Sequence, residues 1–246
     1  MPRRARLAAA GIPVHLIQRG NNRGACFFGE EDYGFYLRHL ETLSKQFGCA
    51  VHAYVLMTNH VHLLLTPQQA DGASLLMKHL GQRYVQYINR TQRRSGTLWE
   101  GRFRSCLAQQ EDYVLACHRY IELNPVRAHM VRHPREYRWS SYRVNAEGKT
   151  SSLIEPQEQF LRLGRTWEAR REVYRALFKA PIDAAETEAI RSATNGGYVL
   201  GNERFKAKIA AALGRRVQRG KPGRPPKEAA DSGGEGQGQL IKEKVV

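Results

Sequence analysis

Two histidines separated by one apolar residue are the first side chains in this sequence whose types and spacing could do chemistry. They are His60 and His62, at the start of a strongly apolar stretch. Side chains alternate between the two faces of a β-strand, so both imidazoles share one face while Val61, Leu63 and Leu65 lie on the other. Two imidazoles at this spacing can bind one metal ion. The alternative is a half-exposed strand that carries two histidines without a function.

A tyrosine and an asparagine four residues apart form the second candidate pair. The apolar periodicity predicts a helix from about Glu111 to Leu123, and on it Tyr120 and Asn124 are neighbours. Pro125 disfavours helical geometry at the residue before it, which places Tyr120 in the last turn. The alternative is that Tyr120 is a packing aromatic and Asn124 a helix C-cap.

The elements before this helix predict how the two pairs are brought together. The order is strand, helix, two strands joined by a two-residue link, helix and strand, at residues 14–19, 31–47, 51–57, 60–65, 73–91 and 98–108. This is the order of a ferredoxin-like α+β fold, an antiparallel sheet with two helices on one face. We expect those helices to cover the face of Val61, Leu63 and Leu65. The tyrosine-bearing helix is then expected over the histidine face.

The patterning divides the chain into four segments. We expect a first domain at residues 1–143, a polar linker at 144–158, a small helical accessory region at 159–218 and a disordered basic tail rich in Gly and Pro at 219–246. The accessory region contains helical patterns at 167–179, 184–192 and 203–213, and Asp183 with Glu186 predicts a capping box for the second. In the tail, residues 220–227 resemble an AT-hook, although a flexible basic linker is the more ordinary interpretation.

The charge balance indicates a polyanionic partner. The chain has 246 residues, with 39 Lys and Arg against 23 Asp and Glu, which leaves a net charge of +16. Nucleic acid is the commonest partner of such a protein. The four cysteines have no paired spacing and no apolar run approaches the ~18 residues of a membrane span. We therefore expect a cytoplasmic, nucleoid-associated protein with no membrane partner, whose state as monomer or homodimer stays open.

Several motifs together resemble one family. They are Gln-Arg-Gly-Asn-Asn-Arg at 18–23, Tyr-Val-Leu-Met-Thr-Asn-His-Val-His at 54–62, Leu-Trp-Glu-Gly-Arg-Phe at 98–103, Arg-Tyr-Ile-Glu-Leu-Asn-Pro-Val-Arg-Ala at 119–128 and Trp-Ser-Ser-Tyr at 139–142. In this order they resemble the REP-associated tyrosine transposases, which are domesticated relatives of the single-tyrosine HUH transposases. The resemblance runs over about residues 13–143.

The resemblance implies a role for each candidate residue. His60 and His62 match the paired histidines that hold a divalent metal, Mg²⁺ or Mn²⁺. Tyr120 matches the nucleophile, and Asn124 matches the amide that completes the metal site. Mobile relatives usually carry the longer glutamine at this last position. The implied activity is a metal-dependent single-stranded DNA endonuclease and strand transferase that forms a covalent phosphotyrosine on REP-like hairpin DNA.

The expected partner is single-stranded or hairpin DNA, held by basic and amide side chains. We predict these to be Arg19, Asn21, Asn22, Arg23, Arg83, Arg93, Arg94, Arg102, Arg104 and Arg127. Two other functions stay open. One is a hairpin-binding protein that kept the fold and lost the reaction. The other is an unrelated metal hydrolase that uses the histidines to activate water and gives Tyr120 no part.

Overall fold

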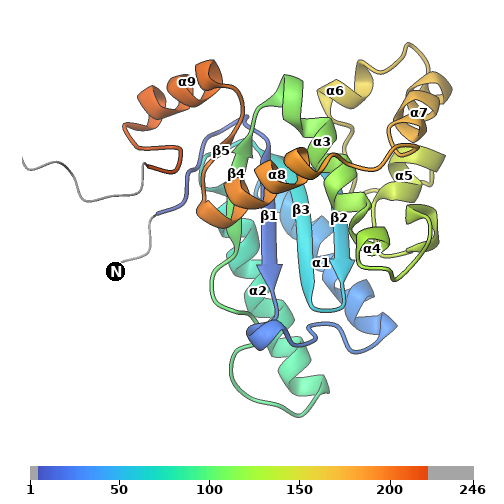
Figure 1. The fold of residues 1–246 in the computed structure, drawn as a ribbon. Coiled ribbons are helices and arrows are strands. Elements are labelled where there is room, and N and C mark those ends of the chain that lie inside the picture. The colour runs from blue at the N-terminus through green and yellow to red at the C-terminus, as the bar shows by residue number, and fades with distance from the viewer. Residues whose placement is uncertain (1–4, 221–246) are drawn as a thin grey trace, which may run out of the picture.

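The structure, a computed structural model, describes residues 5–220 and contains a mixed five-stranded sheet with helices on both faces (Figure 1). The strands are β1 (Val14–Arg19), β2 (Cys49–Met57), β3 (His60–Pro67), β4 (Arg104–Ala108) and β5 (Val199–Leu200). Their order is β2-β3-β1-β4-β5, antiparallel except for the parallel pair β4 and β5. The first four strands with the two helices between them form the predicted ferredoxin-like unit. The α+β fold class is confirmed.

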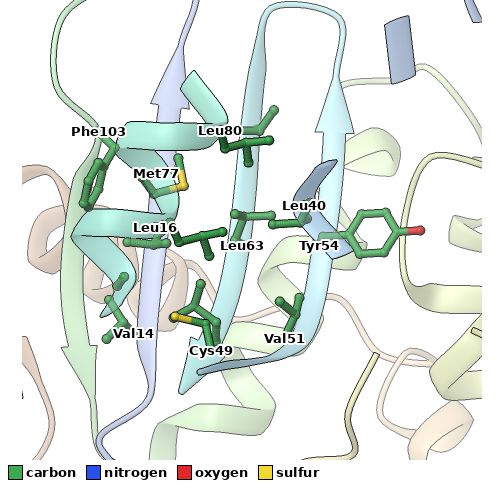
Figure 2. Packing of buried hydrophobic residues seen from close by; sticks show 14 of the residues in the cluster. Val14, Leu16, Leu40, Cys49, Val51, Tyr54, Leu63, Met77, Leu80 and Phe103 are labelled. Atoms are coloured by element: carbon green, nitrogen blue, oxygen red, sulfur yellow. The ribbon is translucent and has the colours of Figure 1, made fainter. Parts of the chain in front are cut away.

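Helices α1 (Glu30–Gln46) and α2 (Gly72–Thr91) cover one face of the sheet. The core between them contains Leu16 from β1, Leu63 from β3, Leu40 from α1 and Leu80 from α2, which meet in Figure 2. Each of these leucines is at most 1% exposed. Burial of a leucine contributes roughly 1.5–3 kcal/mol, so this layer holds the sheet in place. It uses the apolar face of β3, as the alternation predicted.

The opposite face is covered by α3 (Gln110–Glu122) and α8 (Ala184–Gly196), which cross in front of the strands in Figure 1. A second core lies here and includes Leu64 of β3, Ile121 of α3 and Ile190 of α8. The expected tyrosine-bearing helix therefore has a companion from the C-terminal part of the chain.

The free edge of β2 is occupied by segments from later in the chain. Leu56 donates a backbone hydrogen bond to Trp139, and Ser141 donates one to Tyr54. Farther along the strand, Glu155 donates to Val51. An uncovered strand edge invites pairing with another chain. The segment at residues 139–142 thus has a structural role in closing this edge.

Two sequence-based expectations about local structure are wrong. The strand expected at 98–108 begins only at Arg104, because Gly101 has φ of +96° and interrupts the extended backbone. The capping box expected at the start of α8 does not form, since Asp183 makes no side-chain cap. Glu186 instead forms an ion pair with Arg119 at 3.6 Å.

The remaining elements are short helices. They are the 3₁₀ turns η1 (Asn21–Arg23) and η2 (Pro134–Glu136) and the helices α4 (Asn124–Arg127), α5 (Tyr142–Glu147), α6 (Glu158–Leu161), α7 (Trp167–Ala176) and α9 (Glu203–Leu213). A third cluster of buried residues includes Tyr142, Phe160 and Tyr174 and joins α5, α6 and α7. Helix α9 begins with Asn202, whose side chain caps it, and ends at Gly214 in the left-handed conformation.

All four cysteines are free and buried. In the described part of the chain, no helix combines the length and the apolar character needed to cross a membrane. The stretch that resembles an AT-hook and the basic tail lie outside the described residues, apart from Arg219 and Gly220.

Candidate active site

The four residues predicted for catalysis and metal binding line one pocket of about 300 Å³ on the α3 and α8 face of the sheet. Strand β3 supplies His60 and His62, helix α3 supplies Tyr120, and α4 supplies Asn124. The wall also includes His15 and Arg19 of β1, Arg127 of α4, and Arg191, Thr194 and Asn195 of α8.

Strand register explains why these side chains meet. In the antiparallel pair of β1 and β3, Arg19 lies opposite His60 and Ile17 lies opposite His62. Directly opposed residues point to the same face of a sheet. The face of β1 that carries His15, Ile17 and Arg19 is therefore continuous with the histidine face of β3.

His62 takes part in a chain of three hydrogen-bonded side chains. Thr194 Oγ1 donates to the carbonyl of Ile190 at 2.7 Å, so it accepts from His15 Nδ1 at 2.9 Å. The other nitrogen of His15, Nε2, lies 2.9 Å from His62 Nδ1 and is left as the acceptor. His62 therefore carries its proton on Nδ1 and keeps a lone pair on Nε2.

His60 is oriented by a separate pair of contacts. The Asn59 amide donates from Nδ2 to the carbonyl of Arg23 at 3.0 Å, which leaves Asn59 Oδ1 as an acceptor. His60 Nδ1 donates to that oxygen at 2.6 Å. His60 therefore also keeps its lone pair on Nε2, and the side chain of Asn124 lies beside its ring.

Burial and nearby positive charge keep these imidazoles neutral. Burial is the larger cause, and it lowers the pKa of His60 to about 4 with a contribution from Arg19. Burial also lowers the pKa of His15 to about 3, with a smaller effect of Arg127. The pKa of His62 is lowered well below its ordinary value, first by burial and then by its two histidine neighbours. Neutral imidazoles with free lone pairs are the form that binds metals.

This donor set fits a divalent metal. Metal-binding histidines characteristically donate their second N–H to a fixed acceptor, as both His60 and His62 do here. Within residues 5–220, leaving aside the Asp112 side chain, no group of three or more His, Cys, Asp or Glu side chains is arranged to hold a metal ion. Asn124 lines the same pocket beside His60, and its oxygen could complete a site with the two histidines.

Tyr120 is both packed and part of the pocket. Its ring lies edge-on to those of His15 and His62, with centroids 5.6 Å apart in each case. The Arg127 guanidinium lies 4.0 Å above the tyrosine ring and is hydrogen-bonded to Tyr120. Asn124 does not cap α3, because that position is occupied by Leu123. The C-cap alternative for Asn124 is therefore wrong.

Comparisons with known proteins agree with the family resemblance. A family model described as "Transposase IS200 like" matches residues 8–124. Just under half of the chain is therefore similar to the IS200-like transposases. A solved structure described as a REP-associated tyrosine transposase bound to a REP hairpin is similar with a TM-score of 0.52 and 16% identity. The match covers 63% of this chain and 92% of the other.

A second solved structure, a transposase candidate from Deinococcus radiodurans R1, has a TM-score of 0.34 and 21% identity. Its match covers 52% of this chain and 92% of the other. No curated protein matches the chain. The likeness to this family therefore rests on the family model, and the first structure supports the fold.

Most of the residues predicted to contact DNA lie in or beside two adjoining pockets, and three lie elsewhere. Arg19 and Arg127 line the candidate active site. Arg19 is shared with an adjoining pocket whose other basic residues are Arg23, Arg102 and Arg104. Asn21 and Asn22 are exposed in η1 beside this second pocket, next to Arg23. Arg83 on α2 and Arg93 and Arg94 just beyond it line neither pocket.

Four polar residues of the candidate active-site pocket were not predicted from the sequence. His15 could have been found, because the alternation applied to β3 also places His15, Ile17 and Arg19 on one face of β1. Arg191, Thr194 and Asn195 belong to one face of α8, since they are three and four residues apart. No local pattern indicated that α8 packs on the sheet, so these three had no signal in the sequence.

Proposed function

We propose that this transposase domain is a metal-dependent DNA strand transferase that acts on single-stranded DNA beside a REP-like hairpin. One observation carries the proposal. Tyr120, two histidines with fixed free lone pairs, an amide and the guanidinium of Arg127 surround a single pocket. Each group has a place in the transfer of a phosphodiester to a tyrosine.

In this proposal the metal is Mg²⁺ or Mn²⁺, and its ligands are His60 Nε2, His62 Nε2 and the oxygen of Asn124. When bound, the metal supplies charge that polarises the phosphate and stabilises the leaving oxygen. The three ligands are neutral, so they leave the metal its full charge. The hydrogen bonds from His60 to Asn59 and from His62 to His15 hold the ligand rings in position.

Tyr120 is the nucleophile of the proposed reaction. Its hydroxyl oxygen forms a bond to phosphorus while the bond to the 3′ oxygen breaks. The phenol loses one proton and the departing 3′ hydroxyl gains one, so the exchange needs no net proton and no nucleotide triphosphate. Arg127 stabilises negative charge on the phenol oxygen and on the phosphate, and its buried Nη1 has no hydrogen-bond partner among residues 5–220.

The proposed partner is the single strand that flanks a hairpin. The similar solved structure is described as bound to a REP hairpin. In this chain, four arginines line the pocket that adjoins the candidate active site, and their charge can bind the phosphates of one strand. They are Arg19, Arg23, Arg102 and Arg104. A nucleoid-associated location in the cytoplasm is part of the same proposal.

The test is covalent capture. The full chain is incubated with a labelled single strand that carries a hairpin and with Mn²⁺, and the products are separated under denaturing conditions. The wild type should carry the label, and Tyr120→Phe should carry none while it binds the hairpin nearly as tightly. Tyr113→Phe changes a half-buried tyrosine on the same helix and should stay active.

The same experiment separates the other two functions. A hairpin-binding protein without activity would bind the strand, leave it uncut and carry no label. A metal hydrolase would cut the strand without labelled protein, and Tyr120→Phe would still cut. Either result would contradict the strand-transferase proposal.

A further inference from the structure

A buried carboxylate lies on the side of α3 that faces away from the candidate active site. Glu122 is fully buried and follows Tyr120 by two residues on this helix. Two residues turn a helix by about 200°, so the two side chains project from opposite sides of α3. Tyr120 lines the pocket, and Glu122 does not.

Three side chains donate hydrogen bonds to the Glu122 carboxylate. Ser141 Oγ donates to Oε1 at 2.5 Å, and Asn145 Nδ2 donates to the same oxygen at 2.8 Å. The Tyr174 hydroxyl donates to Oε2 at 2.8 Å and accepts from His118 Nδ1 at 3.1 Å. Among residues 5–220, none of the ion pairs includes Glu122. The carboxylate is therefore held by hydrogen bonds alone.

Two of these three donors are themselves bound to the backbone of β2. The N–H of Tyr54 donates to Ser141 Oγ at 2.9 Å. Asn145 Nδ2 donates to the carbonyl of His52 at 3.1 Å. These contacts fix the position of Glu122 Oε1 relative to β2.

Strand β2 connects this network to the candidate metal ligands. It pairs with β3, so that Val55 lies opposite His62 and Met57 lies opposite His60. The helix that carries Tyr120 is therefore joined to the strand that carries both histidines by a path that lies outside the pocket.

Packing alone does not require a carboxylate at this position. The adjacent cluster of buried residues is largely aromatic and includes Tyr142, Phe160 and Tyr174. Apolar side chains of similar volume often stabilise a protein interior as well as buried charged groups do. Hydrogen bonds add direction, because each one restricts a distance and an angle. Three of them on one side chain restrict the rotation of α3 about its axis.

We propose that Glu122 is a positioning residue, whose carboxylate fixes the rotation of α3 so that Tyr120 and Asn124 face the two histidines of β3. The inference rests on the proposed function, because that function makes Tyr120 the nucleophile and Asn124 a ligand. It also gives Ser141 a part in the site beyond closing the edge of β2. A displacement of about 1 Å in a reacting group can slow a reaction by about 100-fold, so a small rotation of α3 is sufficient.

The test compares loss of the carboxylate with a change that loosens the same cluster. Glu122→Leu removes every acceptor, Glu122→Gln keeps one acceptor oxygen, and Tyr174→Phe removes one donor. Phe160→Leu is the matched control, because Phe160 is buried against the Tyr174 ring, with centroids 5.3 Å apart, and has no hydrogen-bonding atom in its side chain. All variants are made in the full chain, and thermal unfolding ranks them by stability.

Two properties are measured far below the melting temperatures. The first is the single-turnover rate of cleavage of a hairpin-bearing strand with Mn²⁺, together with the affinity for that strand. The second is the fluorine-19 NMR spectrum of a fluorinated tyrosine placed at position 120. This spectrum reports the surroundings of the ring in the absence of DNA, metal and reaction.

The expected result is a loss of rate that does not follow stability. Glu122→Leu should cleave about 100-fold more slowly with hairpin affinity nearly unchanged, because only the reacting groups are displaced. Its fluorine resonance should shift or broaden. Glu122→Gln and Tyr174→Phe should have smaller effects in the same direction. Phe160→Leu should keep the rate and the resonance of the wild type even with a lower melting temperature.

A wild-type resonance in Glu122→Leu would overturn the inference. So would an equal loss of rate in Phe160→Leu at a similar melting temperature. If Glu122→Leu does not fold, the comparison of Tyr174→Phe with Phe160→Leu decides the question in the same way.

The outcome is separate from that of the covalent-capture test. Labelled wild-type protein with the same fluorine resonance in every variant removes only the role of Glu122. A resonance that changes in the Glu122 variants, with no label on the wild type, removes only the strand transfer.

Discussion

His15 Nε2 lies 2.9 Å from His62 Nδ1, and the two rings stack with their planes 11° apart. His15 in turn contacts Thr194, which is 179 positions away in the chain. One proposed metal ligand is therefore oriented by a histidine from β1 and a threonine from α8. Residues that act in this way through a ligand typically change metal affinity by about 10–100-fold when they are replaced.

Replacing His15 should weaken metal binding without touching the ligands themselves. His15→Phe removes the acceptor for His62 Nδ1, so we expect the Mn²⁺ dissociation constant to rise by about 10-fold or more. Electron paramagnetic resonance of free Mn²⁺ measures this dissociation constant in the absence of DNA. His15→Gln offers an amide acceptor and should recover part of the affinity. His52 is also a buried, doubly hydrogen-bonded histidine, but it lies outside the pocket. His52→Phe is therefore the control, and an equal effect of both phenylalanine variants would contradict the role of His15.

Asn124 is the proposed ligand whose loss should be most easily compensated. An amide oxygen contributes less to metal affinity than an imidazole, and Mn²⁺ binds nitrogen-containing sites more strongly than Mg²⁺ does. We expect Asn124→Ala to be nearly inactive in low Mg²⁺ and to recover some cleavage in high Mn²⁺. Asn124→Asp should bind metal at least as well and cleave more slowly, because its charge opposes the charge of the attacked phosphate. Cleavage rate against metal concentration is the measurement. If Asn124→Ala reached half of its maximal cleavage rate at the same metal concentration as the wild type, only the two histidines would remain as ligands.

Arg127 and Arg191 line the same pocket and should differ in function. Arg127 is hydrogen-bonded to Tyr120 and lies over its ring, whereas Arg191 is an exposed residue of α8. Arg127→Ala should lower the cleavage rate by about 100-fold with a smaller loss of affinity, and Arg127→Lys should recover little of it. Arg191→Ala should weaken binding and reduce the slope of log affinity against log salt by about one. Single-turnover cleavage and salt titrations distinguish the two variants, and similar effects on both quantities would count against the proposed difference.

Glu122 should make stability depend on pH. Burial raises the pKa of this carboxyl to about 7, against opposing hydrogen bonds from Ser141, Tyr174 and Asn145. The folded protein therefore binds a proton that the unfolded chain has released, and the free energy of unfolding should fall as pH rises from about 4.5 to about 7. The loss is on the order of 3 kcal/mol.

Glu122→Gln should remove most of this slope, because glutamine does not titrate. The free energy of unfolding is measured with urea at pH 5 and at pH 8, and the difference between the two values gives the slope. Glu111→Gln on the same helix changes an exposed carboxyl and should leave the slope as in the wild type. A slope that survives in Glu122→Gln would show that another group carries it.

The fold of the first half of the chain could be predicted because its periodicities are strong. The expected strand at 14–19 coincides with β1, and the helix expected at 73–91 is α2 to within one residue. The expectation failed at β4, where the backbone of Gly101 overrides a stretch of strand-forming residues. The capping box expected at Asp183 also failed, because its second residue, Glu186, forms an ion pair with Arg119 instead.

The contents of the pocket were only partly predictable. His60, His62, Tyr120 and Asn124 meet because strand alternation and helical spacing are local rules. No local rule predicts the position of Thr194, because it contacts His15 only after α8 has packed across β4 and β1. The two-residue strand β5 is too short to leave a periodic signal, and it is the element that leads from α8 to α9.

The distance in sequence between His15 and Thr194 has a consequence for synthesis. The chain leaves the ribosome from its N-terminus, so β1, β3 and the tyrosine-bearing helix emerge before α8. Before α8 is present, His15 lacks the Thr194 acceptor for its Nδ1 proton. His15 can then carry its proton on Nε2 instead, and the proton of His62 is no longer fixed on Nδ1. Under the proposed function, nascent chains that stop before Thr194 would carry the proposed nucleophile without an ordered metal site, and strand cleavage would begin only after α8 has been synthesised.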